Sequence, residues 1–313
     1  MKAVIGIDTS CYTTSCAAVD ESCRVLLSER KTLPVEAGKC GLRQSDAVFL
    51  HVRQFPELFA KVVKGLRGYS TIAVSSSAKP ADGEDSYMPV FMTGLSFARA
   101  IAAAYDVPCY ETTHQRGHLA AAMIDQPALP SRHLAVHLSG GTTDFLIKDE
   151  HVSLKLVAKG LDLHAGQLID RVGVAMGLPF PAGSMLEKLA MQGQASGRYP
   201  AAMRKGGFHL SGAEAAALRD ISAGIRHENI AAEVFDLLVR SVLKMLDVIA
   251  EKTGLRDVLL TGGVASSTLL RTMMEERNNA RRLGLSLSFA LPEYAGDNAA
   301  GIAMIGMERA LKQ

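Results

Sequence analysis

The sequence predicts an α/β protein with two lobes, on the strength of a repeated pattern of strands and helices. Three short strands joined by small-residue turns open the chain, at AVIGID (3–8), SCAAVD (15–20) and RVLLSER (24–30). A second set, with LAVHL, DFLIKD and VSLKLVA, follows within residues 133–160. Apolar runs of strand length with period-two character, bounded by Ser, Thr and Gly, are typical of β-meanders. Two copies of one such unit predict a duplicated fold.

After each meander the segments alternate between strand and helix. The first half continues with a strand at 70–78, a helix at 89–105, a strand at 107–111 and a helix that begins near His114; the second has the corresponding segments at 257–263, 266–283, 285–291 and 296–312. This order is that of the actin-like and hexokinase-like ATPase fold, in which a nucleotide and metal cleft lies between the lobes. The residue identities are not repeated, so the duplication is one of structure.

These segments give a domain prediction. We expect an N-terminal lobe over 1–130 and a C-terminal lobe over 131–295, with a mostly helical insertion at 161–255. The last helix, 296–313, is expected to pack back onto the first lobe. Within the insertion, residues 198–212 are basic and glycine-broken, which predicts an exposed loop.

Composition excludes several classes of protein. A net charge of +2 over 313 residues gives no global basic field for nucleic acid, although a local patch is compatible with it. Five cysteines without a Cys-x-x-Cys pair argue against a disulfide framework and favour a reducing compartment. The N-terminus is too short and polar for a signal peptide, and no apolar run could span a bilayer. The expected location is cytoplasmic, without membrane contact.

His114 and His118 stand four residues apart at the start of an alanine-rich run. On a helix this spacing puts both rings on one face, where they could bind a divalent metal or simply face solvent. The pseudo-symmetry supplies a third ligand, because Asp297 begins the corresponding helix of the second half and would approach from the other lobe. Two imidazoles and a carboxylate suit Zn, Fe or Mn. Alternatively, Asp297 only caps its helix.

Three turns rich in glycine and hydroxyl groups end predicted strands, at 8–15, 138–144 and 261–267. Small residues allow backbone N–H groups to approach a phosphate, and the third turn opens a helix whose N-terminus favours anions. Together they predict a nucleotide between the lobes, although each alone could be an ordinary hairpin turn. Asp170 could meet a ribose or an amino group there, or could be a solvated carboxylate paired with Arg171.

Taken together, these motifs resemble those of the TsaD family, the tRNA threonylcarbamoyladenosine synthase subunit once described as a glycoprotease. GIDTSCYTTSCAAV is similar to the family's Glu-Thr-Ser-Cys opening, HQRGH to its His-x-x-x-His motif, and LSGGTTDFLI to its Ser-Gly-Gly-His-Thr loop. IDRVGVAMGLPFPAGSMLEKLA, TGGVASSTLLR and GDNAAGIAM match three later family motifs in order. The resemblance covers nearly the whole chain. A metalloprotease is disfavoured, because no His-Glu-x-x-His sequence is present.

The resemblance implies a transferase that moves a threonylcarbamoyl group from its adenylate to N6 of the adenosine beside the tRNA anticodon. It implies one iron or zinc ion on His114, His118 and Asp297. It also implies ATP or the adenylate on a second set of residues, Leu138, Ser139, Gly140, Gly141, Thr142, Asp170, Gly183 and Ser267. The expected partners are tRNA, a TsaB-like paralogue and a TsaE-like ATPase subunit, or a second copy of the chain.

Several positions depart from the family pattern. Tyr12, Thr13, Leu163 and Gln167 stand where the family has acidic residues, Thr142 replaces its loop histidine, and Ser267 replaces an asparagine. The segment AKPADGEDSYMP (78–89) replaces its glycine-rich loop. This pattern predicts a divergent member whose transfer activity is weak or partner-dependent. The alternatives are a non-catalytic, regulatory nucleotide-binding paralogue and a carbamoyltransferase with another acceptor.

Overall fold

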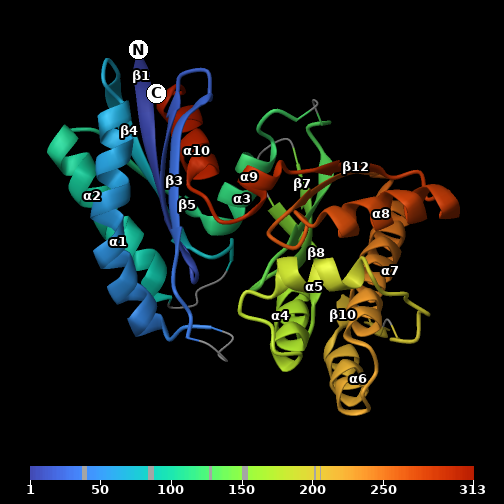
Figure 1. Ribbon diagram of the computed structural model, residues 1–313. Helices are drawn as coiled ribbons and strands as arrows, with labels where there is room; N and C mark the ends of the chain where they lie inside the picture. The colour runs from blue at the N-terminus through green and yellow to red at the C-terminus, as the bar shows by residue number, and fades with distance from the viewer. Residues whose placement is uncertain (37–40, 84–87, 127–128, 150–153, 201, 205) are drawn as a thin grey trace. The chain divides into compact units, whose positions relative to one another are not determined.

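The chain forms two compact units, each with its own β-sheet and core. The computed structural model describes residues 1–36, 41–83, 88–126, 129–149, 154–200, 202–204 and 206–313 (Figure 1). The first unit combines Met1–Val35, Gly41–Ile124 and Glu293–Gln313, and the second contains Asp125–Pro292. The first unit is therefore assembled from both ends of the chain.

A five-stranded sheet in the order β3-β2-β1-β4-β5 forms the centre of the first unit. Strand β1 pairs antiparallel with β2 and parallel with β4, so a meander is joined to a parallel layer. Its strands are β1 (Lys2–Thr9), β2 (Thr13–Asp20), β3 (Val25–Thr32), β4 (Ser70–Lys79) and β5 (Cys109–Thr113). Strand β2 is buried along its whole length and β1 at every residue but the first, as expected for strands covered on both faces.

Helices cover both faces of this sheet (Figure 1). On one side lie α1 (Gln44–Gly65) and α2 (Pro89–Tyr105), and on the other α10 (Ala300–Ala310), with α3 (His114–Ala122) beside it. Successive side chains of β1 point to opposite faces of the sheet, so they pack against the helices of one side or of the other. Ile5 and Ile7 pack in the cluster of α1, whereas Val4 packs against Ala303 and Met307 of α10.

Helices α3 and α10 touch backbone to backbone through Gly117 and Gly301. A Cβ at Gly301 would collide with the Gly117 carbonyl oxygen and lie 2.6 Å from the Ala121 nitrogen. A Cβ at Gly117 would in turn collide with the Ile302 side chain. Only glycine permits this separation, because side chains normally hold helix axes 8–10 Å apart.

The second unit is built on a seven-stranded sheet in the order β12-β11-β6-β7-β8-β10-β9. The strands are β6 (His133–Leu138), β7 (Thr143–Lys148), β8 (Leu154–Gly160), β9 (Ala202–Arg204), β10 (Gly207–His209), β11 (Asp257–Thr261) and β12 (Ser286–Phe289). Its helices are α4 (Ala165–Ala175), α5 (Gly183–Ala190), α6 (Ser211–Ser222), α7 (His227–Thr253) and α8 (Thr268–Arg281), and the short α9 (Pro292–Ala295) leads into the first unit. The buried side of α7 contributes more residues to the core than any other described helix of this unit.

The predicted order of strands and helices is confirmed in both halves, with two differences. Helix α1 was not predicted, because its apolar residues are interrupted by buried His51 and Gln54. The prediction of an exposed loop at 198–212 is wrong. Residues there form β9 and β10 at the edge of the sheet, and Tyr199, Phe208 and Leu210 are buried. Among the described residues, no helix is both long and apolar enough to span a membrane.

We expect Gly301→Ala to destabilise the protein by about 1–3 kcal/mol, the usual cost of forcing a methyl group into a packed contact. Gly212→Ala is the matched control, since a Cβ at this helical position of α6 meets nothing within 4 Å. Removing a glycine from a helix normally stabilises it by about 0.5–1 kcal/mol. Urea denaturation of both variants measures the difference, and equal stability of the two would contradict the close contact.

Candidate metal centre and nucleotide pocket

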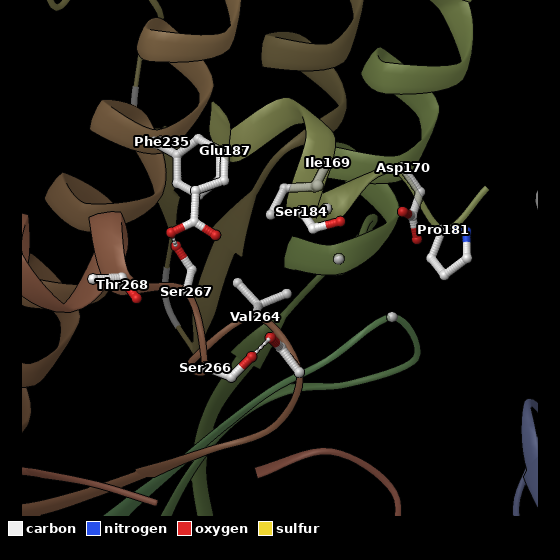
Figure 2. Close-up of a pocket in the computed structure, with 14 residues that line it drawn as sticks. Ile169, Asp170, Pro181, Ser184, Glu187, Phe235, Val264, Ser266, Ser267 and Thr268 are labelled. Atoms are coloured by element: carbon white, nitrogen blue, oxygen red, sulfur yellow. Dashed lines mark hydrogen bonds between the residues drawn. The ribbon is translucent and has the colours of Figure 1, made fainter. Parts of the chain in front are cut away.

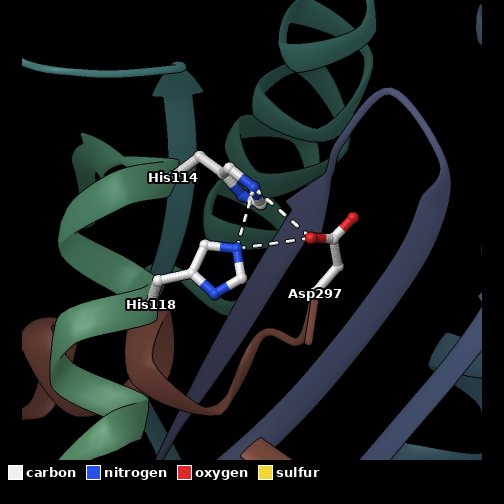
Figure 3. Close-up of side chains that lie close together, drawn as sticks. All are labelled: His114, His118 and Asp297. Carbon is white, nitrogen blue, oxygen red and sulfur yellow. Dashed lines mark hydrogen bonds and ion pairs between the residues drawn. The ribbon is translucent and has the colours of Figure 1, made fainter. Parts of the chain in front are cut away.

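His114, His118 and Asp297 converge on one point in the first unit (Figure 3). The two Nε2 atoms lie 3.1 Å apart, and Asp297 Oδ1 lies 3.6 Å from His114 Nε2 and 3.3 Å from His118 Nε2. Both histidines project from the same face of α3, as their spacing predicted. Three potential ligand atoms thus face one another across a space of ionic size.

Local structure fixes each of these side chains. Helix α3 begins directly after β5, where the Thr113 hydroxyl accepts from Arg116 N–H and caps the first turn. Asp297 lies in the segment before α10, and this segment is held by the neighbouring Asn298. The amide of Asn298 donates to the carbonyl groups of Tyr294 and Gly296, and its oxygen accepts from Ala300 N–H. Asp297 is therefore not the cap of α10, and its carboxylate is directed at the histidines.

Neighbouring polar side chains form hydrogen bonds with His114 and Asp297 and so fix their orientation. Asp8, fully buried on β1, lies 2.9 Å from His114 Nδ1 and accepts a further hydrogen bond from Ser77. The second oxygen of Asp297 accepts from Ser10. Because a carboxylate only accepts, His114 Nδ1 donates to Asp8, and Nε2 is the atom that could bind an ion after losing its own proton. A carboxylate–histidine pair of this kind commonly supports a metal site.

The charges of the cluster are strongly coupled. Burial lowers the pKa of His114, but the carboxylates of Asp8 and Asp297 outweigh it, so this pKa lies well above its usual value. Burial raises the pKa of Asp297, yet its hydrogen bonds with His114 and His118 hold that pKa well below the usual range. The unloaded cluster is therefore an ion pair that keeps a proton where a cation would sit.

The distances fit a single transition-metal ion. Zinc binds nitrogen and oxygen at about 2.0–2.2 Å, so two ligands of one ion are about 2.9–3.5 Å apart. The three separations, between 3.1 and 3.6 Å, correspond to this within a few tenths of an ångström. Two imidazoles and one carboxylate leave coordination positions for a ligand and suit zinc or ferrous iron.

One expectation about this cluster is wrong. The symmetry argument brought Asp297 from the opposite lobe to the histidines, but all three residues belong to the first unit. The reason is the contact between α3 and α10, in which Gly117 and Gly301 bring the start of α10 beside α3. The centre is consequently complete within one compact unit.

A separate pocket of about 410 Å³ lies within the second unit (Figure 2). Volumes of this order are typical of small-molecule sites. Residues of five segments line the pocket: Gly140; Gly166, Ile169 and Asp170; Pro181, Gly183, Ser184 and Glu187; Phe235; and Gly263, Val264, Ser266, Ser267 and Thr268. The predicted turns at 138–144 and 261–267 therefore meet at one site. The predicted turn at 8–15 belongs to the first unit and contributes Ser10 to the metal cluster.

Glycines close the floor of this pocket. A Cβ at Gly166, in the first turn of α4, would lie 2.7 Å from the backbone of Gly140. Gly262 has φ +100°, and a Cβ there would collide with the Leu138 carbonyl oxygen. Gly140 itself has open space where a Cβ would be, so its surface is presented to the pocket.

The N-terminus of α8 already holds an anion, which is the chain's own Glu187 (Figure 2). Glu187 Oε1 accepts from Leu269 N–H at 2.8 Å and from the Ser267 hydroxyl at 2.9 Å. Ser267 caps the helix by accepting from Leu270 N–H. A phosphate could use these groups only by displacing Glu187. The carboxylate is instead suited to accept hydrogen bonds from hydroxyl groups of a ligand.

The predicted nucleotide residues divide into two groups. Gly140, Asp170, Gly183 and Ser267 line the pocket. Asp170 does not pair with Arg171: it accepts from Ala182 N–H at 2.8 Å, and burial raises its pKa. Of the remaining residues, Leu138 is part of the core, and Ser139 N–H closes the turn on the Thr142 carbonyl. Gly141 is exposed. Leu138, Ser139, Gly141 and Thr142 are not among the residues that line the pocket.

Sequence reasoning missed Glu187. The signal for it was its position four residues after Gly183 in an amphipathic segment, where α5 turns both residues to one face. The sequence could not distinguish the lining residue Phe235 from the core residues of α7, because most of this helix is buried.

Comparison with known proteins identifies the family. Residues 88–304 match the TsaD profile, which is described as tRNA N6-adenosine threonylcarbamoyltransferase. The chain belongs to the TsaD family. The match includes α3, the pocket segments and Asp297, so the predicted membership is confirmed from a region that contains both sites.

Solved structures confirm the predicted fold class. HypF in its phosphate- and nucleotide-bound form matches 99% of this chain with TM-score 0.63 and 13% identity, although only 55% of HypF is covered. Component A of the (R)-2-hydroxyglutaryl-CoA dehydratase of Acidaminococcus fermentans matches over 99% of this chain and 100% of its own, with TM-score 0.60 and 15% identity. A ROK hexokinase from Thermus thermophilus matches over 99% and 100% with TM-score 0.57 and 14% identity. The chain therefore has the duplicated actin-like ATPase fold.

We expect the purified protein to bind one divalent ion, with an affinity that rises with pH. An entering ion must displace the proton that His114 holds, so affinity should increase about tenfold per pH unit below the raised pKa of His114. Chelator competition with Zn²⁺ between pH 6 and 8 measures this slope. His114→Ala should abolish binding, whereas His227→Ala, at an exposed position of α7, should not. Unchanged metal content in His114→Ala would show that the ion binds elsewhere.

We expect Gly140→Val to weaken nucleotide binding at least tenfold, about 1.4 kcal/mol. The added side chain would occupy the pocket, and the open space around Gly140 makes the substitution compatible with folding. Calorimetry with ATP compares this variant with Gly212→Val, which adds the same side chain to the exposed start of α6. Equal ATP affinities of the two variants would place the nucleotide outside the pocket.

Proposed function

We propose that this protein transfers a threonylcarbamoyl group from its adenylate to N6 of the adenosine beside the tRNA anticodon. The family match carries the proposal, because it spans both the metal cluster and the pocket. The nucleotide-bound form of HypF shares the fold, which agrees with a nucleotide ligand.

The pocket supplies groups suited to an adenylate. Its apolar residues, Ile169, Val264 and Phe235, offer packing for a base, while Glu187 and Asp170 can accept hydrogen bonds from hydroxyl or amino groups. The Gly140 backbone allows close approach of a polar group. In the proposed reaction these residues fix the donor, so their contribution to rate is mainly positioning.

The metal cluster of the first unit supplies a second set of functional groups. His114, His118 and Asp297 would hold iron or zinc, whose positive charge would stabilise negative charge on carbamoyl or phosphate oxygens. Asp8 keeps the His114 lone pair directed at the ion by accepting the proton of Nδ1. Transfer to tRNA requires loss of a proton from the attacking amino group.

One observation favours a second candidate, a regulatory nucleotide-binding paralogue. Two positions where the family has carboxylates perform structural roles in this chain. Leu163 is buried in the core of the second unit, and Gln167 accepts from His164 N–H in a capping box at the start of α4. Nucleotide binding would survive these changes, whereas an acid–base function at either position would not.

We expect the isolated chain to transfer threonylcarbamoyl to tRNA weakly or only with partner subunits, whether a TsaB-like paralogue with a TsaE-like ATPase or a second copy. Loss of a general base or acid typically reduces rate by about 10²–10⁴. An assay with preformed adenylate and unmodified tRNA measures the rate, with and without the partners. Turnover by the isolated chain equal to that of a complete synthase would refute this expectation.

Gln167→Glu is the informative variant in that assay. Its carboxylate can still accept from His164 N–H, so the helix start should persist while the family's charge is restored. Leu163→Asp is unsuitable, because it would bury an unpaired charge. In a strain depleted of its native synthase, tRNA nucleoside analysis separates the candidates: an enzyme restores the modified adenosine, and a regulatory paralogue leaves it absent.

A further inference from the structure

Ser10, in the turn after β1, is held on two sides by buried groups. Its hydroxyl accepts from Thr13 N–H at 3.1 Å and donates to Asp297 Oδ2. A serine hydroxyl has a single proton. Two acceptors are in reach of that proton, Asp297 Oδ2 and the Thr13 carbonyl oxygen at 3.4 Å, and the carboxylate is both nearer and charged.

The carbonyl group of Ser10 has its own partner, His51 of α1. His51 Nε2 lies 2.8 Å from the Ser10 carbonyl oxygen, and Nδ1 lies 2.7 Å from the Thr14 hydroxyl. Burial lowers the pKa of His51, which favours the neutral ring. A carbonyl only accepts, so Nε2 carries the proton and donates to Ser10. Nδ1 is then an acceptor beside the Thr14 hydroxyl, which also lies 2.9 Å from Gln54 Oε1. Each ring nitrogen thus has one defined partner.

Packing alone does not explain an imidazole at position 51. His51 is fully buried on the face of α1 whose neighbours Phe55 and Leu58 belong to the apolar core. An aliphatic side chain would fill this position without requiring hydrogen bonds, since burying polar groups costs free energy unless they are paired. The pairing that His51 makes leads through Ser10 to the carboxylate of Asp297.

We infer that Ser10 and His51 are positioning residues, which together hold the Asp297 carboxylate in the orientation that binds the metal ion. The inference rests on the proposed metal centre. His51 fixes the Ser10 backbone, and Ser10 fixes Asp297 Oδ2, so that Oδ1 faces His114 and His118. Partners of metal ligands typically contribute a factor of about 10–100 to metal affinity.

The test compares the Zn²⁺ affinities of the unaltered protein and of five variants, measured by chelator competition. Ser10→Ala removes the donor to Asp297, and Ser10→Thr retains it. His51→Leu removes the donor to Ser10, and His51→Gln retains an amide donor in a similar position. The control is His133→Leu, which removes an equally buried imidazole of the second unit, one that bonds only to the Pro130 carbonyl among the contacts described.

Ser10→Ala and His51→Leu should weaken Zn²⁺ binding about 10–100-fold. Ser10→Thr should remain close to the unaltered protein, and His51→Gln should recover part of the loss. His133→Leu should lower the melting temperature without changing affinity. The visible spectrum of bound Co²⁺, which reports ligand geometry, should change in Ser10→Ala but not in the control.

The outcomes separate this inference from the metal centre itself. If the unaltered protein binds neither Zn²⁺ nor Co²⁺, the metal centre and the inference both fail. If it binds them and Ser10→Ala and His51→Leu bind equally well, the centre stands and the positioning role is wrong. If Ser10→Ala or His51→Leu unfolds, Ser10→Thr and His51→Gln are used in its place. An unchanged Co²⁺ spectrum of both supports the inference. Loss of Co²⁺ and Zn²⁺ binding by both overturns it.

Discussion

The contact between α3 and α10 is the constraint on which the first unit depends. Two histidines on one helix and an aspartate beside another can share an ion only if the helix backbones approach more closely than ordinary side chains allow. Gly117 and Gly301 remove the obstructing atoms, and Gly6 does the same where β1 passes under α10. The metal cluster can therefore form only because glycines, which have no side chain, stand at these contacts.

In both units, polar groups are arranged before any ligand arrives. In the first unit Asp8 sets the tautomer of His114, and the cluster holds a proton in place of a cation. In the second unit Glu187 occupies the N-terminus of α8, where an anion is favoured. A cation entering the first arrangement must displace the proton, and an anion entering the second must displace Glu187.

The sequence predicted the strand and helix order, because apolar periodicity and turn residues are local signals. It predicted His114 and His118 together for the same reason. It supported two conflicting expectations for Asp297: pseudo-symmetry put it in the opposite lobe, whereas the last helix was expected to pack onto the first lobe. The second is correct, and it depends on the contact of Gly117 with Gly301, which are far apart in the chain. Helix α1 was missed where buried His51 and Gln54 interrupt the apolar stripe, and polar residues that interrupt such a stripe are the ones with partners elsewhere. The hairpin of β9 and β10 was missed because strands of three residues carry almost no periodic signal.

The division of the chain has a consequence for its synthesis. All strands of the second unit lie in one continuous stretch, Asp125–Pro292, so they are available before the segment from Glu293 onward is translated. The first unit needs Glu293–Gln313, which supplies both α10 and Asp297. Domains generally fold as their residues leave the ribosome. The metal cluster is consequently the last part of this molecule to assemble, and a chain that stops before residue 293 has the complete pocket but no centre to load.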